Sequence, residues 1–304
     1  MSLPTGVDWG LRLQELVIRE KATAPGKVFT FTGDGGADFN DLNEAIAACV
    51  DYRGDTIIVL PRAGGSSHKH SEIIDFNVIG LTVKAASLGM PWEAGGEAIT
   101  ICPASDYTDG PAAKITQPVH LKGLGFTTRY VAAADADSAG LLIDCEETGG
   151  FNGGFSLIEN CRFSCWYGTQ AYGIYTIGGA WNVIKGCTFD GLFGGFGTAG
   201  IEMANDAGGL APCFTHVIEN EFSGLGSGIP AVEFLAGAVP INLVMKSNLN
   251  LDGWGGRGVL LDNNSVVSGG IVADNWTGLA NKAAAFLQLT NSNLSFLGNH
   301  YDET

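Results

Sequence analysis

The sequence lacks a long apolar run. No stretch approaches the roughly 18 consecutive apolar residues that a membrane-spanning helix needs, so no transmembrane segment is predicted. Its first twenty residues, MSLPTGVDWGLRLQELVIRE, are polar and do not show the apolar centre of a signal peptide. We therefore expect a protein that is made in the cytoplasm and does not insert into a membrane.

Positive charge is scarce. The 16 Lys and Arg residues stand against 32 Asp and Glu residues, which gives a net charge of −16. A chain this acidic is not expected to bind the phosphate backbone of nucleic acid or an anionic membrane surface. Charged residues make up only 16% of the chain, whereas glycine accounts for 45 of 304 residues. That composition favours an all-β protein with many turns over a helical one.

The cysteines do not have the spacing of a metal site. No C-x-x-C pair occurs, and Cys161 and Cys165 have no histidine nearby to complete a zinc site. Seven cysteines without a secretion signal indicate reduced thiols. His68 and His70, on either side of Lys69, are a weak candidate pair of metal ligands, and a solvated loop is the preferred interpretation. We expect no metal and no cofactor.

A glycine-rich turn precedes a helix-like run at residues 31–50, which is where phosphate-binding loops occur. The third glycine of a dinucleotide fingerprint is replaced by Asp38, and no Gly-Lys-Ser/Thr sequence is present. Asp41 with Glu44 is typical of a helix-capping pair, and apolar residues follow at helical spacing. The segment therefore predicts a short amphipathic helix over residues 41–51 rather than a nucleotide site.

A first sequence element recurs through the second half of the chain with a period of about 27 residues. Two apolar residues lie five apart with Gly or Asn between them. Residues five apart on a straight strand face opposite sides, so both reach one core only if the chain bends. Gly and Asn adopt the left-handed conformation at low cost, which predicts strand, tight corner and strand in each unit. The pairs are Leu121/Phe126, Ile158/Phe163, Ile184/Phe189, Val217/Phe222, Val244/Leu249, Ile271/Trp276 and Phe296/Tyr301.

A second element recurs in phase with the first and has the pattern small, apolar, variable, apolar. Its copies are Gly140–Ile143, Gly173–Thr176, Gly200–Met203, Ala231–Phe234, Gly258–Leu261 and Ala285–Gln288. Short strands repeated at this period, with no helix in each unit, predict a solenoid of the parallel β-helix type.

Three further expectations follow from the solenoid. Cys161 and Cys187 have the same register and are expected to stack as buried free thiols rather than to form a disulfide. The helix over residues 41–51 is expected to cover the open end of the solenoid, and Thr56–Pro61 is the expected first strand. The repeat is too irregular in residues 62–120 for its rungs to be aligned with the later ones.

The beginning of the solenoid resembles a known family. The segment Gly33-Asp34-Gly35…Asp38…Asp41-Leu42-Asn43-Glu44-Ala45-Ile46, followed by Ile57-Ile58-Val59-Leu60-Pro61, is similar to the start of the pectate-lyase-like right-handed β-helix, in the version of bacteriophage tailspikes and related virion appendages. The resemblance implies a single-stranded right-handed parallel β-helix over residues 28–304, with a short N-terminal capping α-helix and an anchor segment at residues 1–27. The scaffold carries lyases, hydrolases and inert structural parts, so it does not fix the function.

The motifs of the family's enzymes are missing. The sequence has no N-T-D, D-D and G-H-G set as in polygalacturonase-like members, and no arginine beside an acid cluster in the repeat register. One acid pair remains, because Glu202 and Glu233 are outward positions of adjacent rungs, about 5 Å apart and near the separation in a retaining glycosidase. Tyr175, one rung away, is a candidate to stack a sugar. Two solvated or interface glutamates are the preferred interpretation, and the acids at 144–147 are interpreted as a solvated turn.

The same outward column contains too many apolar side chains for a wetted surface: Leu142, Tyr175, Leu260 and Leu287. In the family, such a face is usually covered by two further copies of the chain, which implies a homotrimer. The alternative cover is the chain's own turns, at residues 192–197 or 206–212.

The function expected from these features is that of a non-enzymatic bacteriophage virion protein. It would be an external trimeric β-helix that decorates or cements the capsid, or a short tailspike that attaches to a host. Residues 1–27 would contact capsid or tail proteins, and a host-surface glycan would be the partner in attachment. Two alternatives stay open. One is a glycan depolymerase, a polysaccharide hydrolase or lyase, that uses Glu202 and Glu233. The other is a glycan-binding module that uses Tyr175, Trp166, Trp181 or Trp254.

Overall fold

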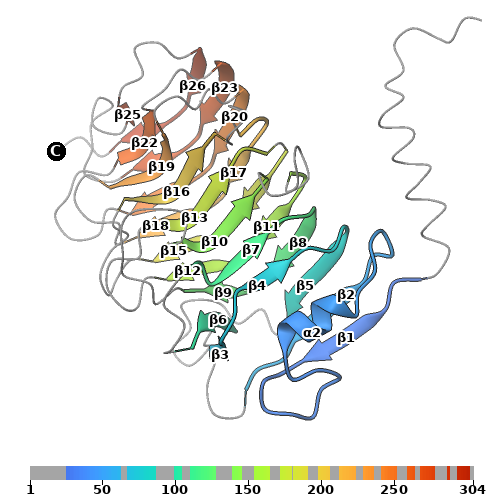
Figure 1. The fold of residues 1–304 in the computed structure, drawn as a ribbon. Helices are drawn as coiled ribbons and strands as arrows, with labels where there is room; N and C mark the ends of the chain where they lie inside the picture. Colours follow the sequence, from blue (N-terminus) through green and yellow to red (C-terminus); the bar gives the residue numbers. More distant parts are fainter. Residues whose placement is uncertain are drawn as a thin grey trace, which may run out of the picture.

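The chain winds through three all-parallel sheets (Figure 1). The computed structural model describes residues 25–62, 67–86, 99–104, 110–127, 139–145, 154–164, 172–179, 181–190, 198–205, 212–223, 229–235, 241–251, 259–263, 268–277, 286–287 and 293–301. Each full turn visits the sheets that we call A, C and B, in that order. The predicted single-stranded right-handed parallel β-helix is confirmed. The expected anchor segment, residues 1–27, lies outside the described residues except for its last three.

Sheet A contains β1 (Val28–Phe31), β2 (Thr56–Val59), β5 (Leu81–Ala85), β8 (Val119–Lys122), β11 (Leu157–Glu159), β14 (Val183–Lys185), β17 (His216–Ile218), β20 (Ile241–Lys246), β23 (Ser268–Ala273) and β26 (Leu294–Leu297). Sheet C contains β3 (Ser67–His70), β6 (Thr100–Pro103), β9 (Gly125–Phe126), β12 (Arg162–Ser164), β15 (Thr188–Asp190), β18 (Glu221–Ser223), β21 (Leu249–Leu251), β24 (Trp276–Thr277) and β27 (His300–Tyr301). Sheet B contains β4 (Ile74–Phe76), β7 (Ala113–Ile115), β10 (Ala139–Asp144), β13 (Tyr172–Ile177), β16 (Ala199–Ala204), β19 (Pro230–Phe234), β22 (Val259–Asn263) and β25 (Phe286–Leu287).

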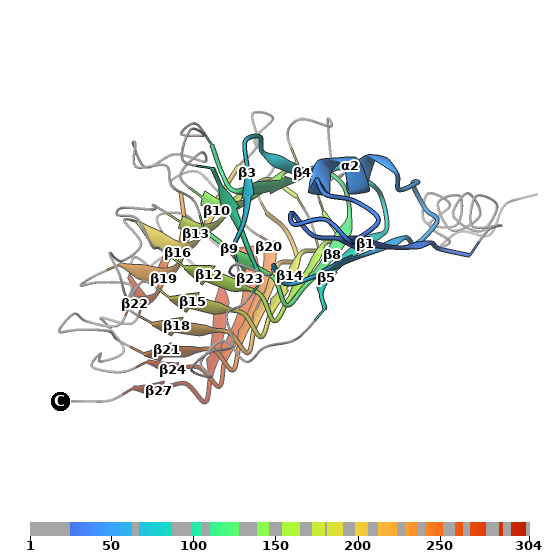
Figure 2. The ribbon, with the colours of Figure 1, turned by 90° about the horizontal axis from the view of Figure 1, so that it is seen from below.

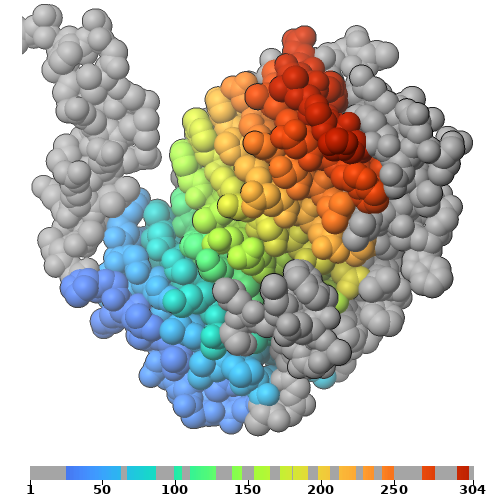
Figure 3. Space-filling view, turned by 180° about the vertical axis from the view of Figure 1, so that it is seen from behind, coloured from blue at the N-terminus to red at the C-terminus, as the bar shows by residue number. Residues whose placement is uncertain are grey.

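In every sheet the strands follow one another in chain order, so each rung is hydrogen-bonded to the rung before it and the rung after it. The space-filling view shows the same order as bands of colour that run from blue at one end of the solenoid to red at the other (Figure 3). In the part of the chain that the structure describes, no helix is both long and apolar enough to cross a membrane.

The solenoid begins one strand earlier than predicted. β1 pairs in parallel with β2, so Val28–Phe31, and not Thr56–Pro61, is the first strand. The predicted helix is present as α2 (Leu42–Ala47), and it ends four residues before the predicted end. Asp41 is its N-cap and accepts a hydrogen bond from the Glu44 N–H at 3.1 Å, as the capping pattern predicted.

Helix α2 packs over the first rungs, in contact with β1 and β4. The helix buries its own residues Leu42, Ala45 and Ile46, whereas Val50, beyond its end, is 49% exposed. The expected covering of this end of the solenoid by an amphipathic helix is therefore observed, with a shorter apolar stripe.

The corner between sheets A and C is narrow and turns in register from rung to rung (Figure 2). It is built from one left-handed residue followed by one inward-facing residue. The left-handed residues are Gly123, Asn160, Gly186, Glu219, Ser247, Asp274 and Gly298. The prediction that Gly or Asn takes this conformation holds for the first three rungs. It is wrong for the next three rungs, where Glu219, Ser247 and Asp274 adopt it, and in the last rung a glycine, Gly298, adopts it.

The asparagines of the later rungs are instead the inward residues of this corner. The side-chain amide N–H of Asn220 donates to Asn248 Oδ1 at 3.0 Å, that of Asn248 to Asn275 at 2.8 Å, and that of Asn275 to Asn299 at 2.9 Å. We call these four residues the asparagine ladder. In earlier rungs the same column holds Cys161 and Cys187, which are buried free thiols as predicted.

A stack of phenylalanines fills the core behind sheet C. Phe126, Phe163, Phe189 and Phe222 follow one another with ring centroids 5.5, 4.9 and 4.6 Å apart. The opposing position on sheet B has little space, since a Cβ on Gly173 would lie 2.6 Å from Phe189, and one on Gly200 would lie 2.9 Å from Phe222. This contact explains the small residue at the start of the second sequence element.

Two predicted pairs are wrong by one residue. Val217 pairs with Met245, and Met245 pairs with Val272, so Met245 and Val272 are the core residues of their rungs. Val244 and Ile271 therefore face outward, and Ile271 is 44% exposed. Because successive side chains on a strand alternate between faces, a shift of one residue moves the predicted core residue to the surface.

Candidate functional site

The outer face of sheet B carries the candidate residues of the sequence analysis. Strand pairing places one residue of each rung in a single column: Asp75, Lys114, Leu142, Tyr175, Glu202, Glu233, Asp262 and Leu287. The predicted adjacency of Glu202 and Glu233 is thus confirmed. Leu260 does not belong to this column, because β22 pairs with β19 two residues further along and brings Asp262 into line with Glu233.

The two glutamates differ in access to solvent. Glu202 is fully buried, with 0% of its surface exposed, whereas Glu233 is half-buried. A glycosidase acid has to reach the glycosidic oxygen or the anomeric carbon of its substrate. In this conformation Glu202 does not reach a substrate on the surface, although the register gives the pair the spacing of neighbouring rungs.

Tyr172 and Tyr175 pack beside these acids. Their rings meet edge to face with centroids 4.9 Å apart, and both side chains are buried, with 3% and 9% exposed. Burial raises the pKa of the Tyr172 phenol, and the negative charge of Glu202 raises it further. Tyr175 therefore supports Tyr172 and does not offer an open face to a sugar. Tyr172 was missed in the sequence because it lies one residue before the recurring four-residue pattern.

The apolar part of the column is covered within the single chain. Leu142 and Tyr175 are 7% and 9% exposed and form a small apolar cluster with Ala139, Tyr172 and Ala199. They are not an open apolar patch, which was the reason for expecting an oligomer interface. The interface role of this column stays a prediction. Residues 192–197, one alternative cover, lie outside the described residues, as do 206–211 of the other.

Of the predicted aromatic platforms, the structure describes Tyr175 and Trp181, which lie on strand β13 of sheet B and before strand β14 of sheet A. Trp166 and Trp254 lie outside the described residues. Trp181 precedes β14 on the outer surface and is 45% exposed. Of the second acid group, only Asp144 is described, and it is half-buried at the end of β10.

His68 and His70 are on a strand, not in a solvated loop as expected. Both point inward from β3 beside Phe31 and are 1% and 6% exposed. With Asp41 and Arg62 they line a pocket of about 290 Å³. His68 contacts the Leu60 carbonyl through Nε2 at 2.9 Å. The alternation of the Ser-His-Lys-His sequence is the signal that could have placed both rings on one face.

The surroundings of this histidine pair keep it uncharged. Burial lowers the pKa of His70 to about 4, although Asp41 opposes the shift, and burial also lowers the pKa of His68. Within the described residues, no group of three or more His, Cys, Asp or Glu side chains is arranged to hold a metal ion. The pair therefore does not form a metal centre with a third side chain of that part of the chain.

The glycine-rich turn before α2 is held by its own aspartates. Asp38 accepts hydrogen bonds from the N–H and the hydroxyl of Thr30, at 2.8 and 2.9 Å, and the Thr30 N–H lowers the pKa of Asp38. Asp34 pairs with Arg62 at 2.8 Å. These carboxylates occupy the turn with negative charge, as the sequence indicated, which leaves it unsuited to phosphate.

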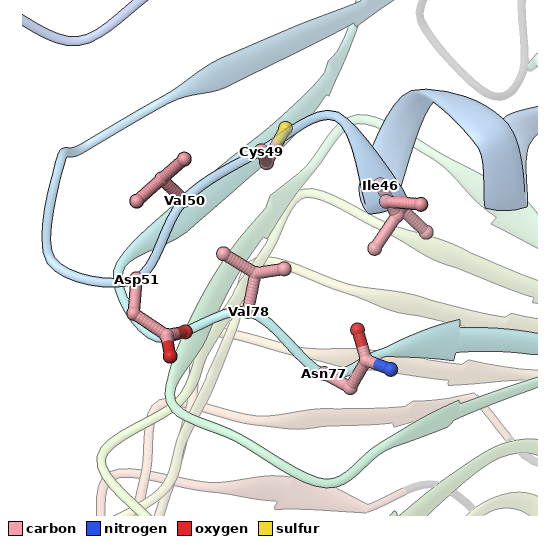
Figure 4. Close-up of a pocket in the computed structure, with 7 residues that line it drawn as sticks. Ile46, Cys49, Val50, Asp51, Asn77 and Val78 are labelled. Carbon is pink, nitrogen blue, oxygen red and sulfur yellow. The ribbon is translucent and has the colours of Figure 1, made fainter.

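A shallow cleft of about 640 Å³ lies beyond the end of α2 (Figure 4). Its apolar rim includes Ile46, Val50 and Val78. The Asp51 carboxylate accepts from the Ile79 N–H at 2.9 Å, and burial raises the pKa of the Cys49 thiol to about 11. The thiol is thus protonated at neutral pH and unreactive, so the cleft does not bring catalytic groups together.

Comparisons with known proteins agree with this architecture. No family model matches the sequence, and no curated protein matches it. Among solved structures, the deglycosylated pectin methylesterase of Aspergillus niger is similar, with a TM-score of 0.54, 12% identity, and coverage of 92% of this chain and 86% of that chain. The pectate lyase Pel9A has a TM-score of 0.50, 13% identity, and coverage of 93% and 79%. At such low identity the likeness shows the fold alone, a pectin-lyase-like parallel β-helix scaffold.

Proposed function

We propose that the protein is a non-enzymatic component of a bacteriophage virion, displayed on the outside of the particle as a trimeric β-helix. In this role it decorates or cements the capsid, or serves as a short tailspike for host attachment. Residues 1–27 attach it to capsid or tail proteins. The similarity of the segment from Gly33 to Pro61 to tailspike β-helices supports this placement.

The observation that carries the non-enzymatic part is the burial of Glu202. The acids best placed for chemistry are Glu202 and Glu233, and Glu202 lies beneath the surface next to two buried tyrosines. A carboxylate used in hydrolysis has to contact its substrate, so this arrangement favours a structural role for the pair.

Polysaccharide cleavage is the second candidate function. It is favoured by the adjacent register of Glu202 and Glu233, and its substrates would be of the kind that a pectin methylesterase or a pectate lyase acts on. It requires a movement that exposes Glu202. Replacing both residues, as Glu202→Gln with Glu233→Gln, is expected to abolish any polymer cleavage by the purified protein.

The first test of the virion proposal is immunogold electron microscopy. Antibody raised against the purified chain is expected to label phage particles released by the host that carries the gene, at regular positions on the capsid or tail. A matched assay measures new reducing ends on acidic and neutral polysaccharides. Unlabelled particles together with cleavage that depends on Glu202 and Glu233 would replace the virion proposal with the enzyme.

A further inference from the structure

Three aromatic side chains form a ladder on the outer surface, where strands of sheet A begin. Phe155, Trp181 and Phe214 occupy the same position in consecutive rungs, just before β11, β14 and β17. The ring centroids of Phe155 and Trp181 are 4.9 Å apart with planes at 15°. Those of Trp181 and Phe214 are 4.6 Å apart at 3°. We call these three residues the aromatic ladder.

The backbone of the ladder is strained. The φ angles of Phe155, Trp181 and Phe214 are 62°, 57° and 53°, in the left-handed region that bulky residues avoid. In the next two rungs the same position is held by Asn242 and Gly269, which adopt this conformation readily. The corner can therefore be built without aromatic residues. Strained residues that persist at a surface point to a functional demand on their side chains.

Two of the three rings are open to solvent, and Phe214 is half-buried. Phe155 is 52% exposed and Trp181 is 45% exposed. Parallel rings in van der Waals contact are about 3.5 Å apart, so a centroid distance of 4.6 Å requires a sideways offset of roughly 3 Å. Each ring therefore covers only part of the next ring, and the rest of that face remains available to a ligand that runs along the solenoid.

A column of lysines follows the ladder on the same face. Strand pairing aligns Lys84, Lys122, Glu159, Lys185, Ile218 and Lys246 on the outside of sheet A. These are four of the nine lysines in a chain with a net charge of −16. Two acids lie along this stretch: Glu159 contacts Lys122 at 3.0 Å and His120 at 3.2 Å, and Glu219, at the corner after Ile218, contacts Lys185 at 3.6 Å. Lys84 and Lys246 lie outside these ion pairs, so the strip keeps a small excess of positive charge on an acidic protein.

We propose that the outer face of sheet A is a binding track for a polysaccharide that bears carboxylate groups. The C–H faces of the sugar rings pack on the aromatic ladder, and the uronate carboxylates approach Lys246 and compete with the exposed Glu219 carboxylate for Lys185. Both features repeat once per rung along the solenoid axis, which suits a linear polymer of repeated units. The track lies on a different sheet from Glu202 and Glu233, and the inference holds whether or not the protein belongs to a virion.

Single-stranded nucleic acid is the other polymer that combines aromatic stacking with positive charge. It is disfavoured because a base stacks on a whole ring face, whereas each ring of the ladder is already partly covered by its neighbour.

The test measures binding of the full-length protein to alginate and polygalacturonate by isothermal titration calorimetry, with neutral dextran and oligo(dT) as comparison polymers. The ladder variant is Phe155→Asn, Trp181→Asn and Phe214→Asn together. Asparagine occupies this position naturally at Asn242, so the variant is expected to keep the thermal midpoint of the parent. A second variant combines Lys185→Gln with Lys246→Gln. Lys69→Gln, on the exposed face of β3 in sheet C, is the charge-matched control.

We expect the parent and Lys69→Gln to bind a uronate polymer and not dextran. The ladder variant should lose at least tenfold in affinity, and the lysine variant several-fold with a weaker dependence on salt. Absence of uronate binding by the parent, equal binding of dextran, or tighter binding of oligo(dT) would each overturn the proposal. Unchanged uronate affinity in the folded ladder variant would do the same.

Discussion

Asn248 sits in the middle of the asparagine ladder and is 1% exposed. Its amide donates to Asn275 Oδ1 and to the Val217 carbonyl, and its Oδ1 accepts from both nitrogens of Asn220. Asn248→Ala leaves several of these buried groups without partners, at about 1–3 kcal/mol for each group. We expect urea unfolding to show a loss of at least about 3 kcal/mol. Asn77→Ala, at an exposed turn position, is the control and should change stability by less than about 0.5 kcal/mol.

His70 should make the fold sensitive to mild acid. Its pKa is about 4 in the folded protein, because of burial, and about 6.5 in an unfolded chain. Above pH 6.5 the ring is neutral in both states and costs nothing. As the pH falls from 6.5 to 4, the unfolded chain takes up the proton first, so stability decreases, by up to about 3 kcal/mol.

This pH dependence is measured by comparing unfolding free energies at pH 7 and pH 4.5. His70→Leu should reduce the difference between them, whereas His300→Gln, at an exposed position on β27, should leave it as in the parent. An identical pH dependence in the parent and His70→Leu would contradict the assignment. Two titratable side chains act on the charge of His70: Asp41 favours its protonation, and His68 opposes it.

Among the strands, β13 depends on a small residue. A Cβ on Gly173 would lie 2.6 Å from Phe189 and 2.8 Å from the Gly200 carbonyl. Gly173→Val therefore displaces the phenylalanine stack, and we expect a loss of about 2 kcal/mol or more, seen as a lower midpoint in thermal unfolding. At Gly33 a Cβ would have ordinary contacts of 3.7 Å or more, so Gly33→Ala should be nearly neutral. Equal midpoints for Gly173→Val and the parent would contradict this prediction and show that the phenylalanine stack shifts to make room for valine.

Some elements were predictable because their pattern is dictated locally. The cap at Asp41, the register of Cys161 with Cys187, and the adjacency of Glu202 and Glu233 all follow from spacing in the sequence. Leu260 and Val244 were misplaced because alternation on a strand fixes the face only when the register is known. Turn lengths set that register, and they vary between rungs.

The histidine pair and the aromatic ladder were harder to predict. His68 and His70 stand after a glycine-rich segment that suggested a loop, and their burial depends on long-range contacts with Phe31. Phe155 and Phe214 belong to no recurring apolar pair, so nothing in the sequence marked them as partners of Trp181. Their alignment becomes visible only when the rungs are stacked.

For the molecule as a whole, light scattering of the purified full-length protein is expected to give about three times the chain mass of 31.7 kDa. This follows from the proposed trimer on a virion. Because Leu142 and Tyr175 are buried in the single chain, Leu142→Ala tests whether the predicted interface lies at this column, and a trimer that survives the change has its contacts elsewhere. A stable monomer at high concentration would contradict a self-contained trimer.

The hydrogen bonds of all three sheets run along the solenoid axis, since each strand pairs only with its counterparts in neighbouring rungs. A force that pulls the two ends apart along this axis therefore loads the rungs in series. The chain should yield one rung at a time, and each rupture should release about 27 residues, on the order of 90 Å of extended chain. The protein would behave under tension as a tether that lengthens one rung at a time before it fails.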